Sequence, residues 1–425
     1  MKILVISRNA WDDTNAIGNT LSNFLTGIKD VEFAGIYFRS SSPRNNLCKK
    51  YYRTTETEVL KNWFTPHKNG KSFVLDASIA NSVEDSAARK EKKIVKFIRN
   101  RELKIAYKLS DYIWYRKKWI NENLKKFVED FNPDLIVTFV KSAPQYYLTI
   151  KYLRDNFKIP LFTWIADDEY TMLKKNGAKR EIENLRYILR ESAFVAGCSQ
   201  EVCDYYNEIF GCQATPLYKG CDLSVHTKKE TSDRITLVYA GNLLYGRLEI
   251  INLISNVVEK LAKDGKKLSF EVYSNTELSA NEQRMYFGDK QFTKYMGRRD
   301  YAFIKKRLSE SNLVLHVESF DDDQVLKTKY SFSTKIIDYL QSGSVLLAVG
   351  PSNVASMKYI SKIPGAYVIT DTSSLEEKIK DVLDSSSSFS EREADMREFA
   401  KCNHDCVLVS EKIQKIFDTI SGEGV

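Results

Sequence analysis

The chain has 425 residues, of which 43% are hydrophobic and 28% charged, and its formal net charge is +8. A chain of this length is too long for a single domain with one hydrophobic core, so we expect two domains. The composition is that of a globular protein, and eight prolines without any low-complexity tract exclude a largely disordered chain.

The first half alternates apolar runs with helical patterns. Residues 2–7 form an apolar run, a polar loop over 8–18 leads into a helical stretch at 19–28, and a second apolar run covers 31–38. Further runs at 134–140, 160–166 and 193–199 each follow a helical pattern. Continuous apolar strands separated by helices predict a parallel sheet with both faces covered.

The segment 89–126 is strongly basic. It holds fourteen Lys or Arg and four Asp or Glu, a net charge of +10 against +8 for the whole chain. Aromatic and aliphatic residues, among them Trp114 and Trp119, are interleaved with the basic ones. This pattern fits an anionic membrane surface, and it equally fits amphipathic helices with a solvated basic face and Trp114, Trp119 and Phe127 in the core. No nucleic-acid motif accompanies the charge, so we expect no nucleic-acid partner.

Cysteine usage and the N-terminus indicate a cytoplasmic location. Seven cysteines have no framework spacing, and the first apolar run is too short for an export signal, so we expect reduced thiols. No apolar run approaches membrane-spanning length. Cys402, His404 and Cys406 provide neither a paired CxxC nor a fourth ligand, so no metal site is expected there.

A polar segment at 228–234 separates this half from a second α/β pattern. Apolar runs at 235–242, 268–274, 313–318, 345–350 and 366–370 alternate with helical stretches, and 391–420 is helical. We therefore expect domains at 1–227 and 228–395 and a C-terminal helix at 396–425. In such a pair the active site is expected in the cleft, where strand carboxyl ends meet helix N-termini.

The stretch 330–343 predicts a loop followed by a helix. Ser333 and Thr334 lie at the join, Lys335 follows, and Asp338 lies on the same helix face as Lys335. Free amides, hydroxyls and a lysine at a helix start suit a phosphate, and a carboxylate one turn later suits a ribose. The alternative is a simple N-cap supplied by Ser333.

These motifs resemble those of GT-B glycosyltransferases, in particular the retaining family-4 type of bacterial surface-polysaccharide assembly. The resemblance is carried by VYAGN at 238–242 with Arg247, by LHVESFD at 315–321, by 331–343, and by YKGCD at 218–222. It implies the GT-B fold: two Rossmann-like domains facing across a cleft, the first for the acceptor and the second for the nucleotide sugar. It also implies a C-terminal helix that crosses back to the first domain.

The resemblance assigns roles in the second half. Arg247 and Lys335, with Ser333 and Thr334, would hold the donor diphosphate, and Asp338 the ribose. Gly241 and Asn242 form the glycine turn. Family members with the full signature carry two glutamates with seven residues between them, whereas this chain has Tyr330 and Asp338 there. The sequence leaves open which acid contacts the transferred sugar; the candidates are Glu318, Asp321, Asp322 and Asp323.

Three residues in the first half complete the predicted site. Gly18 lies in the loop 11–19, where the family's first loop meets donor and acceptor; the alternative is a strand-to-helix turn that needs a glycine. Asp167 and Asp168 follow an apolar run and could face the acceptor or support the reacting sugar. A metal at these acids is the alternative, but the resemblance implies a metal-independent reaction without a cofactor other than the donor.

The expected function is sugar transfer from a nucleotide-diphosphate donor to a saccharide acceptor, lipid-linked by the resemblance, on or near the inner membrane face. The alternative is a catalytically inactive GT-B-like partner subunit that binds membrane or another glycosyltransferase. An epimerase on the same fold would need an acid/base pair of its own, which the sequence does not show.

Overall fold

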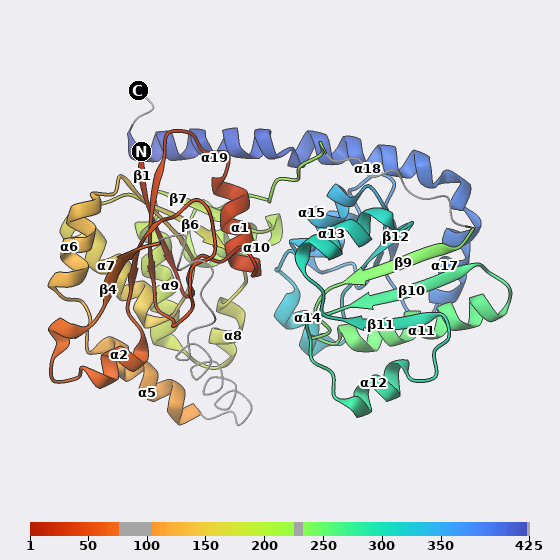
Figure 1. The fold of residues 1–425 in the computed structure, drawn as a ribbon, viewed down its shortest axis with the longest axis horizontal. Helices are drawn as coiled ribbons and strands as arrows, with labels where there is room; N and C mark the ends of the chain where they lie inside the picture. Colours follow the sequence, from red (N-terminus) through yellow and green to blue (C-terminus); the bar gives the residue numbers. More distant parts are fainter. Residues whose placement is uncertain (76–103, 225–232, 423–425) are drawn as a thin grey trace. The chain divides into compact units, whose positions relative to one another are not determined.

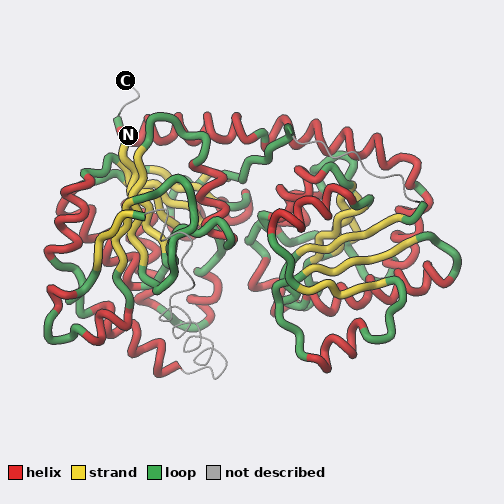
Figure 2. The backbone as a smooth tube through the Cα atoms, in the orientation of Figure 1, coloured by secondary structure: helices red, strands yellow, loops and turns green. Residues whose placement is uncertain are grey.

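The computed structural model describes residues 1–75, 104–224 and 233–422. They divide into two compact units: unit 1 comprises Met1–Leu217 and Val409–Val425, and unit 2 comprises Tyr218–Leu408. In each unit helices flank one sheet (Figures 1 and 2). The predicted boundary at 227/228 falls outside the described residues, so the predicted three-part division stays a prediction.

Unit 1 contains an eight-stranded sheet in the order β4-β3-β2-β1-β5-β6-β7-β8. All neighbours pair in parallel except β3 and β4, which are antiparallel. The strands are β1 Lys2–Ser7, β2 Glu32–Tyr37, β3 Lys50–Arg53, β4 Lys71–Val74, β5 Leu135–Phe139, β6 Leu161–Ile165, β7 Phe194–Gly197 and β8 Thr215–Pro216. The predicted parallel sheet is confirmed, while the short β3, β4 and β8 were not predicted.

The helices of unit 1 cover the apolar faces of this sheet. Residues 3–6 of β1 and all of β5 and β6 are buried, as expected of parallel strands enclosed on both sides. The helices are α1 Ala16–Leu25, α2 Glu56–Lys61, the 3₁₀ turn η1 Pro66–Lys68, α5 Lys104–Tyr115, α6 Glu122–Phe131, α7 Pro144–Phe157, α8 Tyr170–Lys175, α9 Lys179–Glu191 and α10 Gln200–Phe210.

The basic segment 89–126 contributes to this core. Residues 89–103 lie outside the described residues. In the rest, Trp114 and Trp119 are 2% and 1% exposed and pack edge to face with centroids 5.2 Å apart. Phe127 is buried as well. The alternative in which these three aromatic residues belong to the core is therefore correct.

Unit 2 contains a six-stranded parallel sheet in the order β11-β10-β9-β12-β13-β14. The predicted second α/β pattern is confirmed. The strand β11, with its half-exposed side chains, was not predicted. The strands are β9 Ile235–Ala240, β10 Leu268–Tyr273, β11 Thr293–Gly297, β12 Leu313–Val317, β13 Val345–Val349 and β14 Tyr367–Ile369.

The helical tail is interrupted at Asp405, whose extended backbone ends α18 and whose carboxylate caps the next helix by accepting from Val407 N at 2.8 Å. The sequence pattern predicted one helix here. The helices from residue 247 onward are α11 Arg247–Lys263, α12 Ala280–Phe287, α13 Tyr301–Glu310, α14 Asp322–Thr328, α15 Lys335–Ser342, α16 Ala355–Ile360, α17 Leu375–Asp384, the 3₁₀ turn η2 Ser386–Ser388, α18 Phe389–His404 and α19 Cys406–Ser421.

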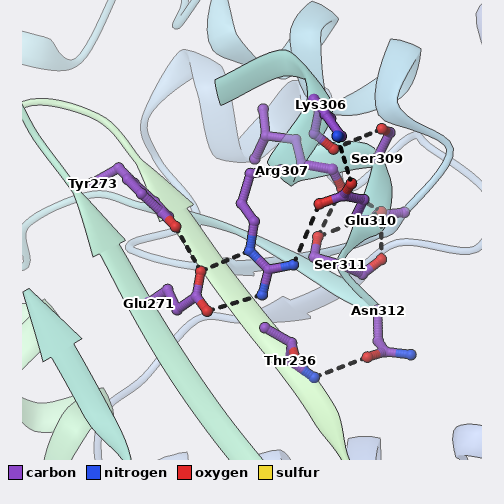
Figure 3. A network of polar contacts seen from close by, with 11 residues as sticks. Thr236, Glu271, Tyr273, Lys306, Arg307, Ser309, Glu310, Ser311 and Asn312 are labelled. Atoms are coloured by element: carbon purple, nitrogen blue, oxygen red, sulfur yellow. Dashed lines mark hydrogen bonds and ion pairs between the residues drawn. The ribbon is translucent and has the colours of Figure 1, made fainter. Parts of the chain in front are cut away.

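A polar network ties α13 to the sheet of unit 2 (Figure 3). Arg307 on α13 donates two hydrogen bonds to Glu271 on β10, at 2.7 and 2.8 Å, and Tyr273 donates a third at 2.7 Å. Beyond the helix, Asn312 accepts from Thr236 N at 2.8 Å. Planar two-point pairing of this kind fixes orientation, so α13 is held in one position along the strands.

A second carboxylate fixes the edge strand β11. Glu259 on α11 is buried and accepts hydrogen bonds from three successive backbone N–H groups, those of Gln291, Phe292 and Thr293, at 3.0, 2.7 and 2.9 Å. Buried backbone donors need such partners. Glu259 therefore supplies the hydrogen-bond acceptors that backbone carbonyls of a regular turn would otherwise provide before β11.

We predict that Glu259→Ala lowers the local stability of unit 2 by about 3 kcal/mol, because buried donors lose a charged acceptor. Hydrogen exchange of peptides covering β10 and β11 would measure the change. Glu249→Ala, an exposed position on the same helix, should shift stability by less than about 1 kcal/mol. Equal protection of β11 in wild type and Glu259→Ala would contradict this account.

Candidate functional site

The turn after β9 brings a glycine and an arginine against the end of β12. Residues 241–246 form the turn, and α11 begins at Arg247. Gly246 has φ +71°, and a Cβ there would lie 2.4 Å from Ser319 Oγ. Only glycine fits this close approach. The start of α11 is therefore fixed against the segment that follows β12.

Arg247 is held by three groups. Its NH1 donates to Asn242 Oδ1 at 2.9 Å and its Nε to Val317 O at 3.2 Å. Its NH2 donates to both oxygens of Glu318, at 2.9 and 3.2 Å. The predicted diphosphate residue is thus oriented by Asn242, a second predicted residue, and by Glu318, one of the four candidate acids.

Glu318 is an interior carboxylate, only 3% exposed. Burial alone would raise its pKa, but His316, with Nε2 3.2 Å from Oε1, and Arg247 outweigh burial and lower the pKa below its ordinary value. Glu318 is therefore ionised in the folded protein and balances the charge of Arg247.

Asp321 lies in a different setting from Glu318. Its carboxylate accepts from Gln324 N at 3.0 Å and caps α14, while its own N–H donates to Ser319 Oγ at 3.1 Å. Asp322 and Asp323 lie exposed in the first turn of that helix. The four candidate acids thus separate into one buried partner of Arg247 and three residues at a helix start.

In the loop before α15, the hydroxyls of Ser333 and Thr334 do not cap the helix. Thr334 is the N-cap residue, but its side chain makes no capping hydrogen bond. Ser333 is fixed through its backbone N–H, which donates to Ser356 Oγ at 3.0 Å, and not through its hydroxyl. Since neither hydroxyl caps the helix, the simple N-cap explanation of this motif is wrong.

Lys335 lies half-buried at the start of α15. Burial lowers its pKa, and the neighbouring charge of Arg247 lowers it further, whereas Asp338 acts in the opposite direction. Among the described residues no hydrogen bond or ion pair engages its ammonium group. A partly desolvated cation of this kind suits an anionic ligand.

Asp338, on the next turn of α15, has partners from two other segments. Tyr301 on α13 donates to its Oδ1 at 3.1 Å, and Lys219 Nζ lies 4.0 Å from the same oxygen. Lys219 is 5% exposed, and burial lowers its pKa although Asp338 opposes this. Neither Lys219 nor Tyr301 was predicted. Lys219 lies inside the quoted YKGCD motif, whereas no sequence signal pointed to Tyr301.

The end of α18 positions Lys219. His404 is buried, its Nδ1 donates to Lys219 O at 3.1 Å, and Tyr359 donates to its Nε2. Tyr218 packs beside it, with ring centroids 4.8 Å from Tyr359 and 5.0 Å from Phe332. The aromatic cluster thus fixes the segment that carries Lys219 against the loop before α15.

In unit 1, Gly18 has a packing role. It lies in the first turn of α1, where its N–H donates to the capping residue Asn15 at 2.9 Å. A Cβ at this position would lie 2.0 Å from Asp12 O. This close approach explains the glycine without a ligand, and its contact with a donor stays a prediction.

Asp167 and Asp168, which follow β6, interact with other residues of unit 1. Asp168 accepts from Tyr206 Oη at 3.2 Å and from Thr171 N at 3.3 Å. Asp167 interacts electrostatically with Lys141, which follows β5. Lys141 also pairs at 2.8 Å with Glu169, a residue that the sequence analysis did not single out. Because β5 and β6 are parallel neighbours, these groups meet at one edge of the sheet.

Glu169 holds Lys141 in place and also accepts from Ser142 N at 2.9 Å. Burial alone would raise the pKa of Glu169, but Lys141 outweighs it and the pKa is lowered.

No group of three His, Cys, Asp or Glu suited to a metal ion occurs within residues 1–75, 104–224 and 233–422. Over the same residues, no helix is both long and apolar enough to span a bilayer.

No family model matches the chain, and no curated protein matches it significantly. Solved structures match nearly its full length. Sucrose-phosphate synthase from Thermosynechococcus elongatus superposes with TM-score 0.62 at 11% identity, over 99% of both chains. HepE from Anabaena, in complex with UDP and glucose, gives TM-score 0.64 at 12% identity, over 99% of this chain and 100% of its own.

A third match is an α,α-trehalose-phosphate synthase (UDP-forming) from Burkholderia xenovorans in complex with glucose-6-phosphate, with TM-score 0.62 at 11% identity over 98% of this chain and 100% of its own. At such identities the likeness shows the fold. The predicted α/β fold class, GT-B with two Rossmann-like domains, is confirmed. The family-4 and retaining assignments stay predictions.

We predict that Glu318→Ala destabilises unit 2 by about 3 kcal/mol, because it leaves Arg247 partly buried without its counter-charge. Urea unfolding followed by circular dichroism would measure the loss. Asp322→Ala, an exposed acid nearby, serves as the control and should change stability by less than about 1 kcal/mol. A Glu318→Ala protein as stable as wild type would show that the pair is dispensable.

His404 makes stability depend on pH. Burial lowers its pKa below the ordinary 6.5, although its bond to Lys219 O opposes this, so the unfolded chain binds the proton more tightly. Its contribution to stability is therefore complete above pH 6.5 and is lost as the pH falls through 6.5 toward the lower folded-state pKa. Urea unfolding at about pH 8 and about pH 5 should show a smaller acid loss for His404→Gln than for wild type. Identical pH profiles would contradict the assignment.

Proposed function

We propose that the chain is a glycosyltransferase that moves a sugar from a nucleotide-diphosphate donor to a saccharide acceptor. The observation that carries the proposal is Lys335, a partly desolvated cation whose ammonium forms no hydrogen bond or ion pair with a described residue. It lies beside the hydroxyls of Ser333 and Thr334, which do not cap the helix. The fold supports it, because HepE of similar fold was solved with UDP and glucose, and other similar folds are named as synthases of sugar phosphates.

The proposed mechanism places the donor diphosphate at the start of α15. The bond between the anomeric carbon of the sugar and the diphosphate oxygen breaks, and negative charge grows on the leaving diphosphate. A hydroxyl oxygen of the acceptor forms the new bond to the anomeric carbon and loses its proton. Lys335, Arg247 and the N-terminal N–H groups of α15 stabilise that charge, with hydrogen bonds from Ser333 and Thr334. These cations supply the positive charge that a metal ion provides elsewhere, so we propose a metal-independent reaction.

The remaining predicted residues have supporting roles in this proposal. Asp338, fixed by Tyr301 and by Lys219, accepts hydrogen bonds from the ribose hydroxyls. Glu318 acts by orienting Arg247 and not by touching the sugar. Gly241 lets the backbone approach the donor, since the turn that it opens also carries Asn242.

The acceptor side of the proposal rests on unit 1. We propose that Lys141, Glu169 and Asp167, gathered at the carboxyl edge of its sheet, contact the acceptor saccharide, while Asp168 braces the start of α8. We further propose retention at the anomeric carbon, a lipid-linked acceptor of surface-polysaccharide assembly, and a cytoplasmic location. The location agrees with the seven free thiols.

One observation favours the alternative that the chain is a catalytically inactive partner subunit. The guanidinium of Arg247 already donates to Glu318, Asn242 and a backbone carbonyl, so a diphosphate would have to share it. A screen of thermal unfolding with UDP, GDP and dTDP separates the two functions. Stabilisation by one of them supports the enzyme, and the absence of any shift supports the partner subunit.

We predict that Lys335→Met weakens binding of the stabilising nucleotide about 30- to 150-fold, because a charged hydrogen bond contributes about 2–3 kcal/mol. The unliganded variant should be as stable as wild type, because methionine keeps the volume and removes a costly buried charge. Lys327→Met, an exposed lysine on α14, is the matched control and should bind normally. Undiminished binding by Lys335→Met would overturn the site assignment.

A further inference from the structure

A group of apolar side chains projects from unit 1 where α2 and α5 lie side by side (Figure 1). Phe64 is 91% exposed, Leu109 56%, Tyr112 53% and Leu60 47%. Trp63 joins them by stacking on Tyr112, with centroids 6.2 Å apart and planes 26° apart. These five residues are called the α2–α5 patch below. Burying one such side chain is worth about 1.5–3 kcal/mol, so their exposure calls for an explanation.

The backbone under the patch is firmly anchored. Asn121, at the start of α6, donates to Pro66 O at 2.9 Å and to Asn69 O at 2.8 Å. Lys118 donates to Trp63 O at 3.1 Å. The loop that carries Phe64 is therefore held from both sides, and Phe64 projects from an ordered turn rather than from a frayed end.

The charge around the patch has one sign. Within residues 56–71 and 109–118, every charged side chain that is exposed is basic: Lys61, Lys68, Lys71, Arg116 and Lys117. The three acids of these segments, Glu56, Glu58 and Asp111, are only partly exposed. Glu56 accepts from Ser110 Oγ at 2.7 Å, and Glu58 pairs with Arg53.

Two aromatic residues of the patch, Trp63 and Tyr112, lie beside cations. Lys118 Nζ lies 4.9 Å from the Trp63 ring centroid, and the Arg116 guanidinium lies 5.6 Å from Trp63 and 5.7 Å from Tyr112. Trp and Tyr with basic residues form the composition that anchors proteins at the boundary between lipid headgroups and acyl chains.

We propose that the α2–α5 patch binds a membrane surface that contains anionic lipids. Phe64, Leu60 and Leu109 enter the acyl boundary, Trp63 and Tyr112 lie at headgroup level, and the surrounding lysines and arginines contact lipid phosphates. A nucleic acid would use the cations but offers no layer for the aliphatic side chains, so the composition favours lipid. This binding is independent of sugar transfer and needs no nucleotide.

Co-sedimentation of the full chain with vesicles tests the proposal. Wild type should bind vesicles of phosphatidylcholine mixed with phosphatidylglycerol and bind vesicles of phosphatidylcholine alone far more weakly. Phe64→Ser should weaken binding about ten- to hundredfold, as expected for one large apolar anchor. Met285→Ser, which removes a side chain 77% exposed on α12 of unit 2, is the matched control and should bind like wild type.

A double variant tests the electrostatic contribution of the basic residues to vesicle binding. Lys61→Gln combined with Lys68→Gln should weaken binding to the anionic vesicles about 25-fold, since each basic residue contributes about 1 kcal/mol near such a surface. Thermal unfolding and nucleotide binding should be unchanged in all these variants, so failure here is distinct from failure of the proposed transfer activity.

Two outcomes would overturn the proposal. One is that wild type does not bind the anionic vesicles, with binding to a single-stranded oligonucleotide pointing to nucleic acid instead. The other is that Phe64→Ser and Met285→Ser bind the anionic vesicles as tightly as wild type.

Discussion

The contact between Arg247 and Glu318 links the two central strands of unit 2. Arg247 starts the helix after β9, and Glu318 follows β12, the neighbouring strand. A carboxylate 3% exposed is tolerated only when opposite charge and hydrogen bonds compensate its lost hydration. Arg247 supplies both, and His316 Nε2 lies 3.2 Å from the same carboxylate. The pair therefore fixes how the glycine turn lies against the end of β12.

The start of α15 shows the opposite arrangement. Arg247 is saturated with hydrogen-bond partners. By contrast, Lys335 and the hydroxyls of Ser333 and Thr334 form no hydrogen bond or ion pair with the other described residues. In the folded protein the charge of Arg247 is compensated by hydrogen bonds and by Glu318, whereas the nearby Lys335 is partly desolvated. Such a difference within one cluster is what a ligand-binding site requires, because a ligand must find groups whose hydrogen bonds the protein itself does not use.

The sequence predicted most of the fold because buried parallel strands such as β5, β6 and β13 are uninterrupted apolar runs. It missed β11, whose position depends on the distant Glu259. In the site it found Arg247, Lys335 and Asp338, which belong to local motifs. It missed Lys219, Tyr301 and Glu169, because only tertiary packing brings them beside Asp338 or Lys141. Four acids between 318 and 323 looked alike in sequence, and only burial distinguished Glu318 from Asp321.

The bond between His404 and Lys219 has a consequence for the order of synthesis. Cys221 N also donates to His404 O, so residues 219–221 are fixed by a residue about 180 positions later in the chain. A ribosome must therefore release nearly the whole polypeptide before this segment can settle beside Asp338. Contacts of such separation slow folding. The placement of Lys219 beside Asp338 is consequently among the last contacts of the candidate site to form.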